Sequence, residues 1–139
     1  MKHIIHLLIL MVILSSTKGL MAEDIYILTS ETSNLPKLEV FQLKNLYLGR
    51  TALLNGKRVN LLDQKEDQSL FLQRVLKKNK NQYKSLWNMK TFTGKGKAPK
   101  IVNKHQLQHI LSQQENAISY STDKASTENL KVLLTVSSP

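Results

Sequence analysis

The stretch LEVFQLKNLYLGR, residues 38–50, carries the clearest structural signal in the chain. Apolar residues recur at i, i+3 and i+7 from Val40 to Tyr47, which is the pattern of one buried face on an amphipathic helix. Gly49 follows directly, and a glycine is typical of a helix end because it readily adopts a left-handed backbone. The stretch therefore predicts a helix over residues 38–48 that packs one face on a core.

Short apolar runs bounded by polar residues or turn signals lie on both sides of this helix and predict strands. They cover residues 24–29, 58–63, 117–120 and 130–136. Further helices are predicted between the Asp67 cap and Lys78, over residues 82–90, and after the Asn103 cap. The order β-α-β-α-α-α-β-β predicts an α/β fold in which helices cover a sheet in a three-layer arrangement.

The first residues have the pattern of a secretory signal. Lys2 precedes a nearly unbroken apolar run, residues 4–14, which is too short to span a bilayer but suits the apolar part of a signal peptide. Small and polar residues follow, and Ala22 is a suitable last residue before cleavage. We therefore expect residues 1–22 to be a cleaved signal peptide and residues 23–139 to form a single domain that works in the periplasm.

The composition sets further limits. Without residues 1–22 the 20 basic residues become 18 against 10 acidic ones, a net charge of +8 that favours anionic partners without choosing among them. The chain has no cysteine, which excludes disulfides, thiolate chemistry and cysteine-ligated zinc.

Several motifs, in order along the chain, resemble the phosphate-binding components of ABC importers, within the type 2 periplasmic binding proteins. Leu46–Arg50 resembles the "IFLGK" helix end of that family, and Asn116–Tyr120 resembles its "GAIGY" strand. Between them, Phe92–Gly96 and Pro99 follow the family order, and residues 130–136 resemble its closing strand. The resemblance covers nearly all of residues 24–136 and is greatest to the short, single-domain members.

This resemblance implies one lobe of a protein class that normally closes two lobes around a ligand. It implies an exported domain that binds phosphate or another small anion weakly and takes part in ABC phosphate uptake or sensing. It also implies a membrane transporter or a sensor protein as the partner. An alternative is an accessory module that binds a protein partner and has kept the lobe fold without the ligand. The sequence also leaves open whether two chains form a homodimer that rebuilds a two-walled cleft.

The resemblance places phosphate where the second long strand meets the next helix, at Asp63-Gln-Lys-Glu-Asp-Gln-Ser69. The candidate ligand-binding residues there are Gln64, Lys65 and Ser69. Three carboxylates accompany a single lysine, so the charge opposes a phosphate site. The competing interpretation makes Glu66 and Asp67 first-turn residues that stabilise the helix.

Thr29 and Ser30 are the other candidate ligand-binding residues. They follow the first predicted strand, and open α/β sheets usually bind ligands beyond strand ends. Their hydroxyls suit an oxyanion, whereas Glu31 opposes one, and ordinary loop and capping roles remain the alternative.

The remaining motifs indicate neither an enzyme nor a cofactor. His105 and His109 lie at i and i+4, but the glutamate of a zinc-protease motif and a third ligand are missing, so we expect a surface pair and no metal site. The lysines around Gly94 and Gly96 lack interleaved aromatic residues, so we do not expect nucleic acid as a partner. Trp87 is expected to anchor the core together with Tyr83 and Phe92.

Overall fold

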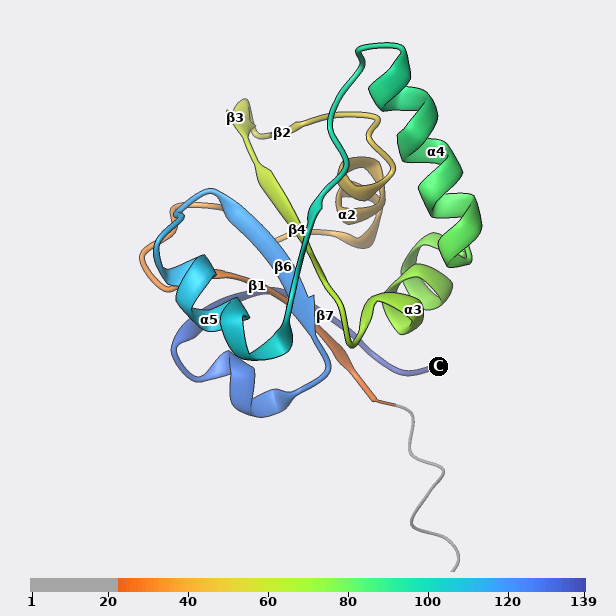
Figure 1. The fold of residues 1–139 in the computed structure, drawn as a ribbon. Coiled ribbons are helices and arrows are strands. Elements are labelled where there is room, and N and C mark those ends of the chain that lie inside the picture. Colours follow the sequence, from red (N-terminus) through yellow and green to blue (C-terminus); the bar gives the residue numbers. More distant parts are fainter. Residues whose placement is uncertain (1–22) are drawn as a thin grey trace, which may run out of the picture.

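The structure is a computed structural model that describes residues 23–139, and the predicted signal peptide lies outside these residues (Figure 1). The strands are β1 (Ile25–Ser30), β2 (Leu53–Leu54), β3 (Lys57–Arg58), β4 (Asn60–Gln64), β5 (Lys100–Val102), β6 (Ala117–Ser121) and β7 (Leu130–Val136). The helical elements are α2 (Val40–Tyr47), α3 (Gln68–Phe71), the π-helical turn η1 (Leu72–Leu76), α4 (Lys80–Phe92), α5 (Lys104–Ser112) and the 3-10 turn η2 (Lys124–Thr127).

Five strands form one mixed sheet in the order β5-β4-β6-β1-β7, and β2 pairs with β3 in a separate hairpin. β4 runs parallel to both β5 and β6, whereas β1 runs antiparallel to β6 and to β7. The carboxyl ends of β4, β5 and β6 therefore lie together at one end of the sheet, which we call its carboxyl end. The carboxyl end of β1 lies at the opposite end.

Helices cover both faces of this sheet, which confirms the predicted α/β fold. Side chains of α2, η1 and α4 pack with the sheet in the larger apolar cluster, and those of α5 pack in a smaller one. Figure 1 shows α5 on one side of the sheet and α2, α3 and α4 on the other. The strands feed both clusters because successive side chains point to opposite faces, with Ile27 in the larger cluster and Leu28 in the smaller.

Three aromatic residues lie at the centre of the larger cluster. The rings of Phe71 and Tyr120 stack with centroids 3.9 Å apart, and the rings of Tyr47 and Phe71 meet at a steep angle with centroids 4.8 Å apart. The Tyr47 hydroxyl donates to the carbonyl of Leu62 at 2.9 Å, so this fully buried residue joins α2 to β4. Burying each such side chain stabilises the fold by roughly 1.5–3 kcal/mol.

The helix predicted over residues 38–48 is present as α2, which begins two residues later and ends one residue earlier than predicted. Its start is fixed by Gln42, whose Oε1 accepts from the N–H of Glu39 at 2.9 Å. It ends before Gly49, which has a φ of +67°, as the sequence pattern predicted.

Three features of the fold differ from the sequence predictions. β5 and the β2–β3 hairpin were not predicted, and α4 is longer than its predicted range of residues 82–90 because Asn79 caps its start. Trp87 and Tyr83 are buried as expected. Phe92 is not, because the last turn of α4 extends beyond the core and leaves this ring 93% exposed.

No helix within residues 23–139 is both long enough and apolar enough to cross a bilayer.

Candidate functional site

The turn after β4 meets the segment after β6 at the carboxyl end of the sheet, and a carboxylate lies between them. The N–H of Thr122 donates to Asp67 Oδ2 at 2.8 Å, and the Thr122 hydroxyl donates to Asp67 Oδ1 at 3.0 Å. Gln64 Nε2 also donates to Oδ2, at 2.7 Å, while Gln64 Oε1 accepts from the N–H of Asp67 at 2.8 Å. The carboxylate of Asp67 therefore holds three hydrogen-bond donors at the place where the resemblance puts phosphate.

The predicted role of Asp67 as the side-chain cap of its own helix is wrong. Asp67 lies at the N-cap position of α3, yet its carboxylate makes no capping hydrogen bond there. It turns to Thr122 instead, because the parallel pairing of β4 and β6 brings the two segments together.

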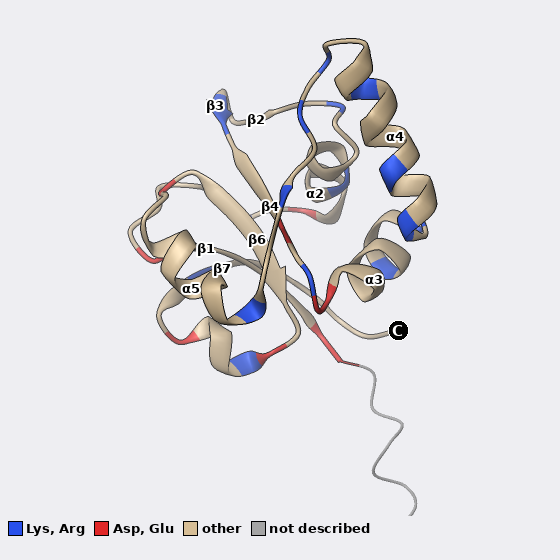
Figure 2. Cartoon of the chain, viewed as in Figure 1, with Lys and Arg blue, Asp and Glu red and all other residues tan. Residues whose placement is uncertain are grey.

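Two further carboxylates bind backbone donors beside this turn. Glu66 Oε2 accepts from the N–H of Lys104 at 2.9 Å, so it caps α5 rather than the helix that follows it in sequence. Asp123 Oδ1 accepts from the N–H of Ala125 at 3.0 Å, and its Oδ2 lies 3.4 Å from Lys104 Nζ. Figure 2 shows the acidic turn after β4 and the charged residues near the start of α5. Three N–H groups at this end, those of Lys104, Thr122 and Ala125, are thus bonded to carboxylates of the chain itself.

The structure places three of the predicted ligand-binding residues in or beside this turn. Gln64 is fully buried and bonded to Asp67, whereas Lys65 and Ser69 are exposed. A ligand from solvent could reach Lys65 and Ser69 directly, but it would reach Gln64 only if Asp67 moved away.

The other two predicted residues, Thr29 and Ser30, lie at the opposite end of the sheet. The hydroxyl of Thr29 donates to the carbonyl of Ala117, at the start of β6, at 2.7 Å. Ala117 pairs with Asn60, and Gln64 is four residues further along β4, so the two groups of candidates are roughly 13 Å apart. Ser30 is 2% exposed, with its hydroxyl 3.1 Å from that of Thr32. The structure does not bring the five residues together into one site.

A buried carboxyl group lies directly beneath the turn. Asp63 is 1% exposed, and its two oxygens accept from the hydroxyls of Tyr83 and Tyr120, each at 2.8 Å. Burial raises the pKa of Asp63, while hydrogen bonds from Tyr120, Tyr83 and Gln68 partly oppose that rise. Burial likewise raises the pKa of Tyr83 and of Tyr120, helped by the nearby Asp63 charge. The cluster ties β4, α4 and β6 together, and it has no surface on which a substrate could bind.

The predicted surface pair, His105 and His109, is exposed on α5. Within residues 23–139 no three histidine, aspartate or glutamate side chains are grouped so that they could hold a metal ion.

Sequence reasoning missed Thr122, although a signal for it was present. The strand 117–120 was predicted, and residues that follow parallel strands meet at one end of a sheet. The missing information was that this strand pairs with β4 in parallel, which the sequence pattern does not state.

Comparison with known proteins identifies the fold. No protein-family model matches the sequence, and no curated protein is significantly similar to it. A solved structure described as a phosphate ABC transporter substrate-binding protein of Clostridium perfringens, with bound phosphate, is similar at a TM-score of 0.61 and 13% identity. An ABC-type phosphate transport receptor of Vibrio cholerae is similar at a TM-score of 0.52 and 11% identity.

Each likeness covers 80% of this chain but only 44% and 45% of the two longer proteins, so the chain spans less than half of their length. Both are transport binding proteins rather than enzymes. At these identities the likeness concerns the fold alone. The chain therefore has the α/β fold of about one lobe of a phosphate-binding transport protein.

Proposed function

We propose that this protein is an exported, single-lobe relative of the phosphate-binding proteins that works by binding a protein partner, as an accessory or sensor subunit. We further propose that it does not capture phosphate at the turn after β4. The observation that supports the lack of phosphate capture is the Asp67 carboxylate, which already accepts hydrogen bonds from the N–H and hydroxyl of Thr122 and from the side-chain amide of Gln64.

The energetic reason is charge. A phosphate anion at these donors would lie about 4 Å from the Asp67 carboxylate, where like charges repel by about 4 kcal/mol at an effective dielectric constant near 20. Solvent screening lowers this figure, but half of it already weakens binding more than tenfold. The single lobe adds to this, because contacts that normally come from two walls must come from one.

Weak binding of phosphate or another anion, in phosphate uptake or sensing, is the competing function. The phosphate in the similar Clostridium perfringens structure favours it, as do the exposed Lys65 and Ser69 at the same turn. A homodimer that supplies the second wall stays a prediction, which light scattering with and without phosphate tests.

Calorimetric titration with phosphate, at ionic strengths of about 20 and 150 mM, separates the two functions. We expect no heat of binding up to millimolar phosphate for the wild-type protein, and binding to appear in Asp67→Ala and Asp67→Ser. Lys37→Ala, which removes an exposed lysine from the loop before α2, is the control and should show no binding. Saturable binding by the wild-type protein that Asp67→Ala does not strengthen would contradict the proposal.

The partner is sought with a photo-crosslinking residue placed at Ser69, at the carboxyl end of the sheet, and at Lys37 on the loop before α2 as a control. A discrete adduct from Ser69 alone, formed in intact cells, supports a partner at this end. Equal labelling from both positions, or none, counts against it. Cell fractionation with and without residues 1–22 tests export.

A further inference from the structure

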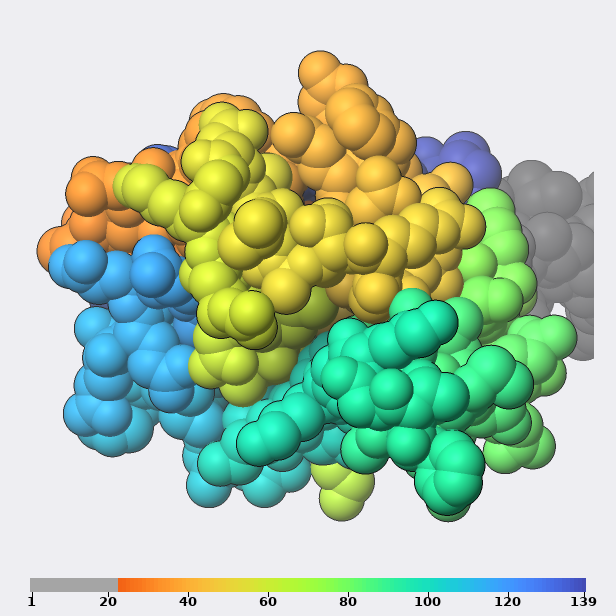
Figure 3. All heavy atoms as spheres, turned by 90° about the horizontal axis from the view of Figure 1, so that it is seen from above, coloured from red at the N-terminus to blue at the C-terminus, as the bar shows by residue number. Residues whose placement is uncertain are grey.

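A second feature of the molecule is a cleft of about 1140 Å³ at the other end of β4 from the Asp67 turn. Residues 49–52 and the start of β4 line one side, and the loop 94–100 lines the other. Figure 3 shows these two segments, in yellow and teal, facing each other across one face of the molecule. The innermost side chains are those of Leu46, Val59 and Trp87.

The cleft is strongly basic. Its lining includes five cationic side chains and no aspartate or glutamate; the five, called the cleft cations below, are Arg50, Arg58, Lys95, Lys97 and Lys100. All five are exposed. Within residues 23–139 the one ion pair is that of Lys104 with Asp123, so no carboxylate of these residues forms an ion pair with a cleft cation.

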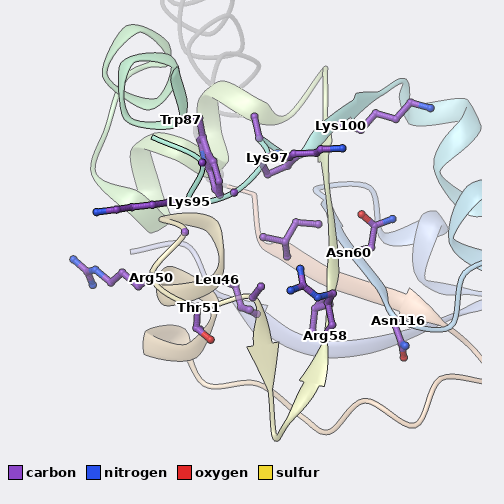
Figure 4. Close-up of a pocket in the computed structure, with 18 residues that line it drawn as sticks. Leu46, Arg50, Thr51, Arg58, Asn60, Trp87, Lys95, Lys97, Lys100 and Asn116 are labelled. Carbon is purple, nitrogen blue, oxygen red and sulfur yellow. The ribbon is translucent and has the colours of Figure 1, made fainter. Parts of the chain in front are cut away.

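The cleft cations are spread along the cleft rather than focused on one point. In Figure 4, Arg50 and Lys95 extend at one end, Arg58 and Lys97 lie over the middle, and Lys100 extends at the other end. A single phosphate ion could contact only some of these groups at a time. An extended chain with repeated negative charges could contact all of them.

The uncharged part of the lining decides between kinds of polyanion. Leu46, Val59 and Trp87 are each at most 6% exposed, so they offer little surface to the apolar side chains of a peptide. Trp87 is also held in the core by its Nε1, which donates to the carbonyl of Tyr47 at 3.2 Å. The lining therefore has no exposed aromatic ring on which nucleic-acid bases could stack. Apart from small polar and apolar side chains such as Thr51, Asn60 and Ala98, the cleft therefore offers mainly charge for recognition.

We propose that this cleft binds a linear phosphate polymer without bases, whose successive phosphate groups pair with the cleft cations. Counter-ion release by five contacts gives a slope of about −3.5 for log affinity against log salt, by analogy with single-stranded nucleic acid. The affinity then falls about a hundredfold between 50 and 200 mM salt.

Trp87 gives a local signal for this binding, because it is the single tryptophan of the chain and lines the cleft. The probe is inorganic polyphosphate of about 50 units, titrated into the purified protein while tryptophan emission is recorded. Orthophosphate at equal total phosphate and a dT oligonucleotide of matched charge are titrated in parallel. We expect a saturable change with polyphosphate, none with orthophosphate, and binding of the oligonucleotide at least tenfold weaker.

The decisive comparison is between two variants of equal charge. Lys95→Gln/Lys97→Gln/Lys100→Gln should lose at least tenfold in affinity and about 2 units of the salt slope. Lys37→Gln/Lys80→Gln/Lys84→Gln removes three exposed lysines outside the cleft and should stay within threefold of wild type. Lys→Arg at the first three positions should keep binding, which separates lost charge from a disturbed loop.

Equal losses in the two glutamine variants would overturn the site and leave attraction by net charge. Binding of the oligonucleotide as tight as that of polyphosphate, and dependent on the cleft lysines, would identify a nucleic-acid site instead. No emission change at 50 mM salt would also overturn the proposal.

Discussion

Thr122 binds both oxygens of the Asp67 carboxylate, with its N–H 2.8 Å from Oδ2 and its hydroxyl oxygen 3.0 Å from Oδ1. The two residues are 55 positions apart in the sequence. The contact joins the ends of β4 and β6, and it also puts a negative charge at the position where the resemblance expects a bound anion. One interaction therefore links the stability of the lobe to its proposed lack of phosphate binding.

Replacing Asp67 by alanine should destabilise the protein. The variant loses three charge-assisted hydrogen bonds at a half-buried position, for which we expect a decrease of about 2 kcal/mol in the free energy of unfolding. Urea denaturation followed by circular dichroism measures it. Lys65→Ala, in the same turn but exposed, should change the value by less than about 0.5 kcal/mol. Similar losses in the two variants would show that the Asp67 contacts contribute little.

Asp63 should make stability fall as the pH rises. Its pKa in the folded protein is raised above the ordinary value of 3.8, so the folded state binds this proton more tightly than the unfolded state does. The contribution of the group is therefore complete below the ordinary pKa and is lost as the pH rises through the folded pKa. Urea denaturation at a series of pH values from about 3.5 upward measures this dependence.

Asp63→Asn is the control for that pH series. Asparagine keeps the size of the side chain and can still accept a hydrogen bond from Tyr83 or Tyr120, but it does not titrate. We expect the variant to lose the part of the pH dependence that belongs to this group. An unchanged pH profile in Asp63→Asn would mean that other carboxyl groups cause the dependence.

Much of the fold could be predicted from the sequence, because apolar periodicity records which faces are buried. The four long strands and the helices around Tyr47, Trp87 and Leu107 follow from that signal. β5 did not, because it has three residues and only Val102 of them is buried. A strand this short has no measurable period, and the glycines and proline before it indicate a loop.

The candidate site was harder to predict, because it depends on strand direction. Thr29 and Gln64 both follow or end apolar runs, and nothing in those runs shows that β1 is antiparallel to β6 while β4 is parallel to it. The direction of each strand decides which end of the sheet a residue reaches. For the same reason the partner of Asp67 could not be found by local rules, which connect it to the next helix.

Gly49→Ala should destabilise the protein through two effects. An alanine Cβ would lie 2.8 Å from both Trp87 Cη2 and Lys90 Cδ, and the φ of +67° disfavours any residue with a Cβ. Gly56→Ala is a matched control, because its φ is +79° but no atom lies within 4 Å of the new Cβ. We expect a loss of about 1 kcal/mol at Gly56 and about 2 to 3 kcal/mol at Gly49 in thermal or urea denaturation. Equal losses would show that the contact with Trp87 relaxes without cost.

Tyr120→Phe should cost more than Tyr47→Phe, although both remove one buried hydroxyl. The Tyr47 hydroxyl donates to the carbonyl of Leu62, which also accepts from Ser119 at 3.0 Å and so keeps a partner; about 1 kcal/mol should be lost. The Tyr120 hydroxyl donates to Asp63, so its removal leaves a buried oxygen of that group without this donor and should cost about 2 to 3 kcal/mol where Asp63 is ionised.

The pH dependence of these two losses tests the cause of the difference. The Tyr120 hydrogen bond lowers the pKa of Asp63, so Tyr120→Phe should raise that pKa further. The cost of the variant should then shrink at low pH, where Asp63 is protonated in wild type and variant alike, because a neutral carboxyl group is less costly to leave without a donor. The cost of Tyr47→Phe should depend less on pH, since its acceptor does not titrate. Urea denaturation of both variants over a pH series from about 3.5 upward measures this. A cost of Tyr120→Phe that is the same throughout the series would show that the ring contact with Phe71, rather than the bond to Asp63, was disturbed.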